Sequence, residues 1–166
     1  MSALGVHFAL EEADVGALRA HVDDASRLVH VQEVIEDQFF ESRPDQIVET
    51  VHAWDAIHRC LTDGTLRGTS GLPLEIVVLG GLSLYEGDDY IMALKLPAEV
   101  RSAAPRLASI GEREFRARYL TLDPNEYDGE IGDDDFAYTW EHFQALREFW
   151  ARAAANGRSV LFTADQ

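Results

Sequence analysis

The sequence predicts one compact α+β domain over residues 1–166, mostly helical and with a small β-sheet. Three observations indicate this class. Apolar residues recur at helical spacing along most of the chain, short apolar segments typical of strands occur near both chain ends, and the segments between them are short. A chain of 166 residues, of which 46% are hydrophobic, can bury a sizeable core as a single domain.

The first forty residues begin with a strand and continue as helices. The apolar segment Gly5–Leu10 is typical of a short strand, and helical composition follows over residues 11–21. A second helix is expected to begin at a cap formed by Asp24 or Ser26 and to continue to about Phe40.

The sequence predicts a third helix over residues 45–63, because Asp45 is a good N-cap and Gly64 can end a helix. Its apolar positions are spaced four, three, four and three residues apart, and they define one helix face. They are Ile47, Val51, Trp54, His58 and Leu61. Since His58 falls on this face, its ring is expected to be at least partly buried.

The middle of the chain contains one ambiguous segment. Residues 74–79 form a short apolar run that suits either a helix or a strand, so both remain open. Residues 82–85 and 90–96 flank a Gly-containing turn and predict a β-hairpin. Pro97 suits the first position of a helix that extends to Ile110.

The last third of the chain predicts a short helix containing Phe115 and Tyr119, an acidic loop over residues 123–135, and the longest helix. The apolar face of that longest helix consists of Phe136, Trp140, Phe143, Leu146, Trp150 and Ala153. Phe149 lies off this face, which predicts an exposed contact residue. A closing strand over residues 159–163 is expected in the same small sheet as the first strand.

The chain is strongly acidic. Fourteen basic residues against thirty acidic ones give a formal net charge of -16. Nucleic-acid binding depends on clustered Lys and Arg, so a nucleic-acid partner is not expected. A halophile's solubility device is an alternative explanation of the same charge.

Cysteine content and hydropathy indicate a cytoplasmic protein. Cys60 is the single cysteine, which excludes an intramolecular disulfide and a cysteine-based zinc site. The N-terminal segment lacks the basic region and the apolar length of a signal peptide. Because no apolar run approaches the roughly 20 residues of a membrane span, no membrane association is expected.

One group of residues suggests a ligand site: Trp54, Asp55, His58 and Arg59. On a helix, Asp55 lies beside both His58, three residues on, and Arg59, four residues on. A carboxylate next to an imidazole is one ingredient of acid–base catalysis. The structural alternative, which we favour, is a core histidine bonded to Asp55 or to a backbone carbonyl, next to an Asp–Arg ion pair.

A second candidate is a run of seven carboxylates without a basic residue: Asp123, Glu126, Asp128, Glu130, Asp133, Asp134 and Asp135. As a functional feature it predicts a docking surface for a basic protein partner. The structural alternative is a solvated loop whose last acids stabilise the N-terminus of the next helix. A calcium site is disfavoured, because an EF-hand loop aligned on Asp123 lacks the required ligand and glycine.

No motif predicts a metal, a cofactor or a catalytic residue. The six histidines have no metal-ligand spacing, and Cys60 lies about 200° around a helix from His58, so the two side chains do not face each other. Neither a phosphate-binding pattern nor a nucleophile elbow occurs in the chain.

Several stretches occur together: Trp54-Asp55-x-x-His58-x-x-Leu61-Thr62, Pro73-Leu74-x-x-x-Val78-Leu79-Gly80, Asp89-Tyr90-Ile91 leading to Leu96-x-x-Glu99-Val100, Phe115-Arg116 and Phe162-Thr163. In this combination the chain resembles the YfbM-like family, a bacterial family of unknown function. The resemblance covers nearly the whole chain and implies a single-domain α+β fold without known catalytic residues. Proteins that resemble this one look like occasional neighbours of bacterial toxin systems, which implies an immunity role.

Two functions are therefore compared. The first is a non-enzymatic acidic binding protein, an immunity-type antagonist of a cationic toxin or of another basic partner. The second is a small-molecule-binding or hydrolytic enzyme in which His58 transfers protons, Asp55 orients it and Arg59 holds an anion. A pocket formed by these three side chains would favour the enzyme. Nothing in the sequence indicates the oligomeric state.

Overall fold

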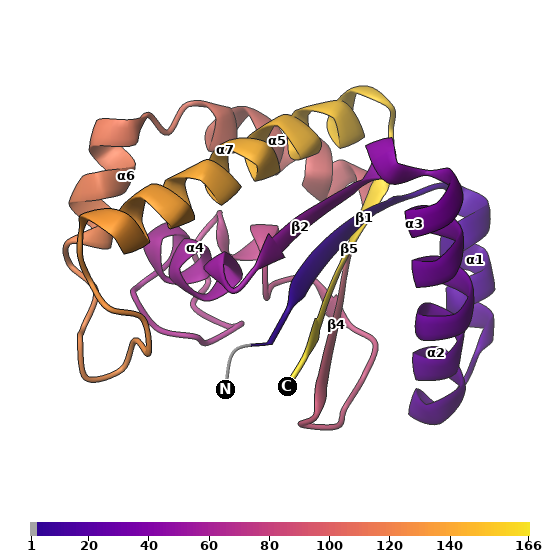
Figure 1. The fold of residues 1–166 in the computed structure, drawn as a ribbon. Helices are drawn as coiled ribbons and strands as arrows, with labels where there is room; N and C mark the ends of the chain where they lie inside the picture. Colours follow the sequence, from indigo (N-terminus) through magenta and orange to yellow (C-terminus); the bar gives the residue numbers. More distant parts are fainter. Residues whose placement is uncertain (1–2) are drawn as a thin grey trace.

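The computed structural model describes residues 3–166. A five-stranded antiparallel sheet forms its centre, in the order β2-β1-β5-β4-β3 (Figure 1). The strands are β1 (Gly5–Leu10), β2 (Ile47–Val51), β3 (Leu82–Ser83), β4 (Tyr90–Lys95) and β5 (Ser159–Asp165). Gly5 pairs with Ala164 and Leu10 with Ser159, so the two ends of the chain lie side by side in the middle of the sheet. This confirms the expected pairing of the first and last strands.

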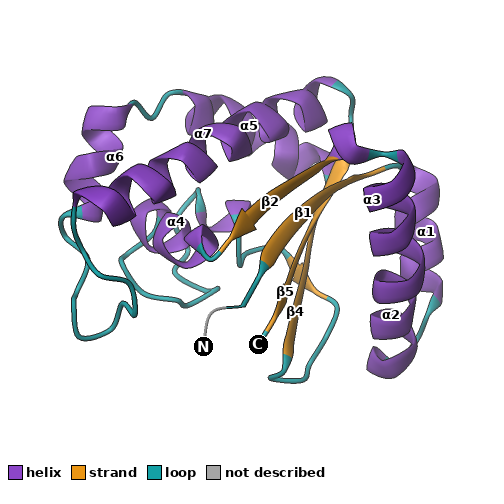
Figure 2. Cartoon of the chain, viewed as in Figure 1, coloured by secondary structure: helices purple, strands orange, loops and turns teal. Residues whose placement is uncertain are grey.

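Helices cover both faces of the sheet (Figure 2). One face carries α1 (Glu12–Ala20), α2 (Asp24–His30), a π-helical segment (Val31–Glu36) and α3 (Asp37–Ser42). The other face carries α4 (Ala53–Leu61), α5 (Pro97–Ala108), α6 (Glu112–Tyr119) and α7 (Asp133–Ala155). About 52% of the chain is helical, which confirms a mostly helical α+β domain.

The alternation of side chains along each strand separates two cores. In β1, Phe8 and Leu10 point to the α1–α3 side and pack with Leu18 and Phe39. The next side chain, Ala9, belongs to the larger core beneath α4–α7. Because both faces are buried, the central strands are almost continuously apolar.

The helix predicted over residues 45–63 is wrong in its first half. Pro44–Gln46 forms a single 3-10 turn, Ile47–Val51 is strand β2, and α4 begins only at Ala53. The segment is rich in β-branched residues, and its pairing with β1 outweighs the helical spacing of its apolar positions. The register of the β1–β2 pairing shifts between Gly5 and Val6. Val51, the last residue of β2, has a φ of 48°, which is a strained conformation for a β-branched residue.

Two further expectations need correction. The second helix is capped by Asp23, whose Oδ1 accepts a hydrogen bond from the Ser26 N–H at 2.8 Å, rather than by Asp24 or Ser26. Phe149 is 1% exposed rather than a surface contact, because α7 packs against both α5 and the sheet and so buries a broad face.

The ambiguous run at 74–79 is neither a long helix nor a strand, since only Glu75–Val77 forms a 3-10 turn. The predicted hairpin is confirmed as β3 and β4, and Pro97 is the first residue of α5. Within residues 3–166, no helix combines the length and the apolar composition that crossing a membrane requires.

Candidate functional site

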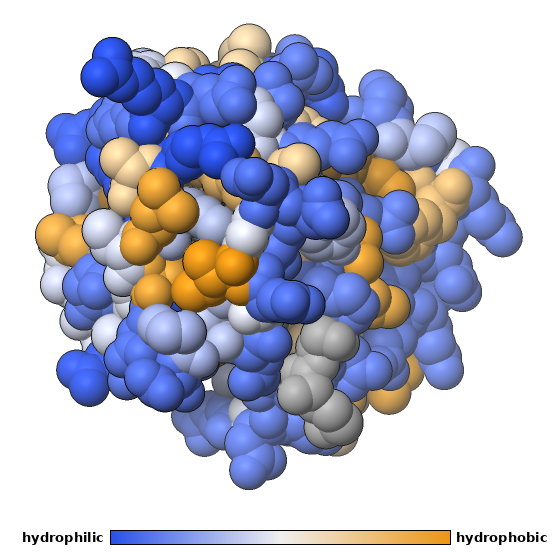
Figure 3. Space-filling view, turned by 60° about the vertical axis from the view of Figure 1, so that its left-hand side comes forward, coloured by the Kyte–Doolittle hydropathy of each residue, from blue (hydrophilic) through white to orange (hydrophobic). Residues whose placement is uncertain are grey.

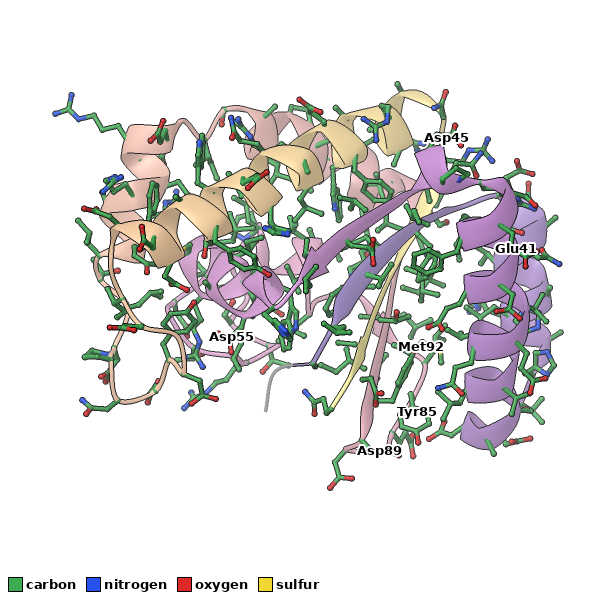
Figure 4. The ribbon with its side chains drawn as sticks, viewed as in Figure 1. Glu41, Asp45, Asp55, Tyr85, Asp89 and Met92 are labelled. Atoms are coloured by element: carbon green, nitrogen blue, oxygen red, sulfur yellow. The ribbon has the colours of Figure 1, made fainter. Side chains whose placement is uncertain are left out.

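The start of α4 lies against the beginning of β1. The indole Nε1 of Trp54 donates a hydrogen bond to the Ala3 carbonyl at 2.9 Å, and the indole ring lies 5.7 Å from the ring of Phe162. Gly5 permits this close packing, because a Cβ at that position would lie 2.7 Å from Cδ1 of Trp54. These contacts hold the first turn of α4, and Asp55 with it, at one end of the sheet (Figure 4).

Arg59 joins α4 to the acidic loop. Its Nε donates to Oδ1 of Asp55 at 2.6 Å, which is the ion pair that the spacing predicts. Its two terminal nitrogens donate to the carbonyls of Gly64 and Glu126, each at 3.1 Å. With all these partners and 6% exposure, the guanidinium has a structural role.

His58 faces the interior. Its ring is fully buried, and Nε2 lies 2.9 Å from the carbonyl oxygen of Arg67 rather than against Asp55. Burial lowers the pKa of His58, with nearby charges as smaller influences. The neutral ring therefore holds the loop that follows α4, as the structural alternative anticipated.

A cleft of about 660 Å³ opens where α4, the acidic loop and α7 meet. It is lined by Ala3, His52, Trp54, Asp55, Tyr127, Asp128, Gly129, Asp135 and Tyr138. The cleft thus combines half of the Trp54 group with two members of the acidic run, although some 70 residues separate them in sequence. His58 and Arg59 are not among its lining residues.

The cleft is negatively charged. Three carboxylates line it, those of Asp55, Asp128 and Asp135, and none of the described residues that line it is a Lys or an Arg. Burial raises the pKa of Asp55, and the charge of Asp128 adds to this effect, although the ion pair with Arg59 opposes it. A positive charge placed in the cleft would therefore be stabilised.

Two tyrosines fix the third carboxylate of the cleft. Oδ2 of Asp135 accepts hydrogen bonds from the hydroxyls of Tyr119 at 2.5 Å and of Tyr127 at 3.0 Å. Burial first, and then the neighbouring Asp135 carboxylate, raises the pKa of both hydroxyls, so they stay protonated and keep donating. Asp135 is thereby held in one position at the N-terminus of α7.

The other five predicted acidic residues lie outside the cleft. Asp123, Glu126, Glu130, Asp133 and Asp134 are all exposed. Asp123 accepts a hydrogen bond from the Asn125 N–H at 2.9 Å, and Asp133 forms an exposed ion pair with Arg116 at 3.0 Å. Figure 3 shows the molecule with the left-hand side of Figure 1 turned forward. Hydrophilic residues surround a patch of hydrophobic residues on this face.

Sequence reasoning missed three side chains of the cleft: His52, Tyr127 and Tyr138. Tyr127 lies within the acidic run, and an aromatic residue among seven carboxylates was a usable signal. Tyr138 follows Asp135 by three residues and so shares a helix face with it. His52 became a cleft residue only because the predicted helix is interrupted by β2.

Within residues 3–166, no group of three or more His, Cys, Asp or Glu side chains is placed to hold a metal ion. Cys60 is buried, and burial raises the pKa of its thiol to about 12.

Comparison with known proteins identifies a family and a fold. A family model described as a domain of unknown function, DUF1877, matches residues 1–163. The crystal structure of YfbM from Escherichia coli, described as a protein of unknown function, is similar with a TM-score of 0.67 and 20% identity, over 97% of this chain and 99% of that one. The comparison with curated proteins finds no match. The predicted resemblance to YfbM-like proteins is confirmed, and at this identity the similarity to YfbM itself extends to the fold alone.

Proposed function

Because the chain belongs to the DUF1877 family, whose function is unknown, we propose a function from its own cleft: it is a non-enzymatic domain that binds a basic protein partner. The observation that carries this proposal is the joining of Asp55, Asp128 and Asp135 in one cleft that no Lys or Arg of the described chain lines. A Lys or Arg side chain of the partner brings a positive charge to these carboxylates.

The aromatic residues of the cleft suit the same ligand. Trp54, Tyr127 and Tyr138 line the cleft together with the carboxylates, and Tyr138 is the most exposed of the three at 37%. Aromatic faces attract ammonium and guanidinium groups, and planar guanidinium groups also stack on them. Of the two cationic side chains we therefore favour arginine.

The net charge of -16 supports association with a basic partner. Opposite charge steers two proteins together and can raise the association rate by about 10 to 10³. We extend the proposal to an immunity-type antagonist that neutralises a cationic toxin in the cytoplasm. A toxin antagonist benefits from such fast association.

The geometry favours binding over the acid–base alternative. In that alternative, Asp55, His58 and Arg59 must face one substrate. Asp55 lines the cleft, but Nε2 of His58 is occupied by the Arg67 carbonyl, and the guanidinium of Arg59 is occupied by Asp55 and two carbonyls. The three groups do not converge on one space.

The test is calorimetric titration with the basic peptide acetyl-GRTRRVRG-amide. The Asp128→Asn/Asp135→Asn double variant removes two cleft charges, whereas Glu141→Gln/Glu148→Gln removes two charges from exposed positions of α7. We expect the affinity to fall at least about tenfold, or about 1.4 kcal/mol, in the cleft variant and less than about twofold in the control. Equal losses in both variants, or no binding to the wild type at low salt, contradict the proposal.

A further inference from the structure

The geometry of β2 points to the form of the partner. We propose that the partner binds as an extended basic segment that adds to the free edge of β2, with alternate side chains entering the cleft and a second acidic groove on the opposite face of the sheet. This inference rests on the proposed function only for the cleft. The edge and the second groove are separate observations.

The outer edge of β2 has no strand partner. β2 is the terminal strand of the sheet, and within residues 3–166 it pairs only with β1. Val48 and Thr50 turn toward the core beneath α4–α7, while Glu49 on the other face is exposed. In Figure 1, β2 lies beside β1, and α7 runs close to it over one face of the sheet. The outward N–H and C=O groups of β2 are therefore available to a further strand.

This edge lacks most of the features that protect sheet edges. Proteins commonly shorten an edge strand or place Lys or Pro on it to prevent strand addition. The opposite edge, β3, is only two residues long. By contrast, β2 has five residues and contains neither Lys nor Pro, and its only charge is that of Glu49. A bulge at its far end and Val51 at φ 48° limit any added strand to this short stretch.

A second acidic groove of about 260 Å³ lies on the α1–α3 side of the same region. Glu36, Glu49 and Asp165 supply its carboxylates, and no Lys or Arg of the described chain lines it. Leu4 and Phe40 add apolar surface and are 56% and 44% exposed. The groove suits a basic side chain and an apolar side chain two residues away from it on the same strand.

The cleft and the groove lie on opposite faces of the sheet, near the beginning of β1 and the end of β2. The consecutive residues Ala3 and Leu4 line the cleft and the groove, respectively. In the same way, Glu49 of β2 lines the groove, and His52, just beyond β2, lines the cleft. Successive side chains of a strand point to opposite faces of a sheet, so a strand added beside β2 directs its odd and even residues to different hollows.

Charge decides between a basic segment and a second copy of this chain. Edge-to-edge pairing of two copies would bring two clefts and two grooves, all lined by carboxylates, close together, on molecules that each carry a charge of -16. Like charges placed together at an interface cost several kcal/mol. A peptide segment with basic residues at both odd and even positions instead meets carboxylates on both faces of the sheet.

Backbone methylation tests the strand addition directly. The same peptide, acetyl-GRTRRVRG-amide, is compared with two versions N-methylated at either the odd or the even positions, which retain every side chain and charge. Only alternate residues of an added strand direct their N–H groups to the edge. We expect one version to lose at least about tenfold in affinity and the other to bind within about threefold of the parent peptide. If both versions bind like the parent peptide, the strand addition is wrong and the cleft proposal stands; if the parent peptide itself does not bind, the cleft proposal fails first.

A second variant tests the groove. We expect Glu36→Gln/Glu49→Gln to weaken the unmethylated peptide at least about fivefold, while the binding of arginine amide, which needs only the cleft, stays unchanged. Gel filtration at the titration concentrations reports on self-pairing. A peptide affinity unaffected by the groove variant, or a dimer of the free protein, contradicts the inference.

Discussion

The cleft and the interior of the protein both contain titratable groups, but these groups differ in sign and in exposure. The interior buries basic side chains, whereas the cleft is lined by carboxylates. In the interior, Lys95 is fully buried, its Nζ donates to the carbonyls of Val78 at 2.6 Å and Ala93 at 3.0 Å, and burial holds its pKa well below the ordinary value. His7 is also fully buried, and its pKa is lowered by burial and by Lys95. The cleft instead gathers three carboxylates, and none of the described residues that line it is a Lys or an Arg.

This difference shows which kind of unusual group indicates a site in this fold. His7, His58 and Lys95 are fully buried, where a ligand cannot reach them, and burial lowers the pKa of each. The carboxylates of Asp55, Asp128 and Asp135 instead line an open cleft, where a cationic ligand can reach them. A group of carboxylates lining an open cleft is therefore a better guide to function here than a shifted pKa alone.

The largest expected effect separates two histidines that lie six residues apart. His58→Ala removes a fully buried ring and its contact with the Arg67 carbonyl, and should lower the free energy of unfolding by about 3 kcal/mol. His52→Ala, at an exposed position of the cleft, should leave stability unchanged. Urea unfolding measures both, and equal effects would show that the interior and the cleft are not distinct.

Asp55 belongs to both regions, so its removal should affect both stability and binding. Asp55→Ala deprives the buried guanidinium of Arg59 of its ion pair and should cost about 2 kcal/mol of stability. A double-mutant cycle with Arg59→Met measures the coupling between the two residues, which we expect to be about 1–2 kcal/mol. The Asp55→Ala variant should also bind the peptide more weakly than the wild-type protein does. Additive stability losses would contradict a coupled pair.

A smaller effect, dependent on pH, tests the neutral interior. Above pH 6.5, the ordinary pKa of histidine, His7 is neutral in both the folded and the unfolded chain. Below this pH the unfolded chain binds a proton that the folded chain does not, so His7 destabilises the fold increasingly as the pH falls. Neither ring nitrogen of His7 has a hydrogen-bond partner within residues 3–166. His7→Phe should therefore stabilise the protein by about 1 kcal/mol near neutral pH, and by more near pH 5. A gain that shrinks on acidification would contradict a neutral His7.

The smallest expected effect concerns the strained residue that leads into the cleft. Val51→Gly relieves a β-branched residue at φ 48°, but it also loses side-chain contacts and makes the unfolded chain more flexible. The two contributions should nearly cancel, so that stability changes by less than about 1 kcal/mol. Peptide affinity should nevertheless fall severalfold, because Val51 directs His52 and the start of α4 into the cleft. An unchanged affinity would show that Val51 does not position these residues.

Elements with strong local signals could be predicted from the sequence. The Asp55–Arg59 ion pair follows from four-residue spacing on a helix, and α5 begins at Pro97 as expected. The closing helix and strand also appear where their patterns indicate. For the ion pair and the start of α5, the deciding interactions lie within one or two helical turns.

Features that depend on distant parts of the chain could not be predicted. β2 forms because β1, about forty residues earlier, offers a pairing edge that the helical spacing of Ile47 and Val51 does not reveal. The cleft exists because Arg59 binds the Glu126 carbonyl and so brings the acidic loop onto α4. Local spacing contains no information about either contact, and Phe149 was misplaced for the same reason, since its burial depends on the packing of α7.

The central claim is that the cleft, and not the polar interior, receives a positively charged ligand. The most direct test is a titration of ¹⁵N-labelled protein with arginine amide, followed by the backbone and indole N–H resonances. We predict saturable shifts at residues 52–55, 127–129, 135 and 138, including the indole N–H of Trp54, and none at His7 or Lys95. Shifts spread evenly over the exposed acidic residues, or concentrated around His58 and Lys95, would contradict the account.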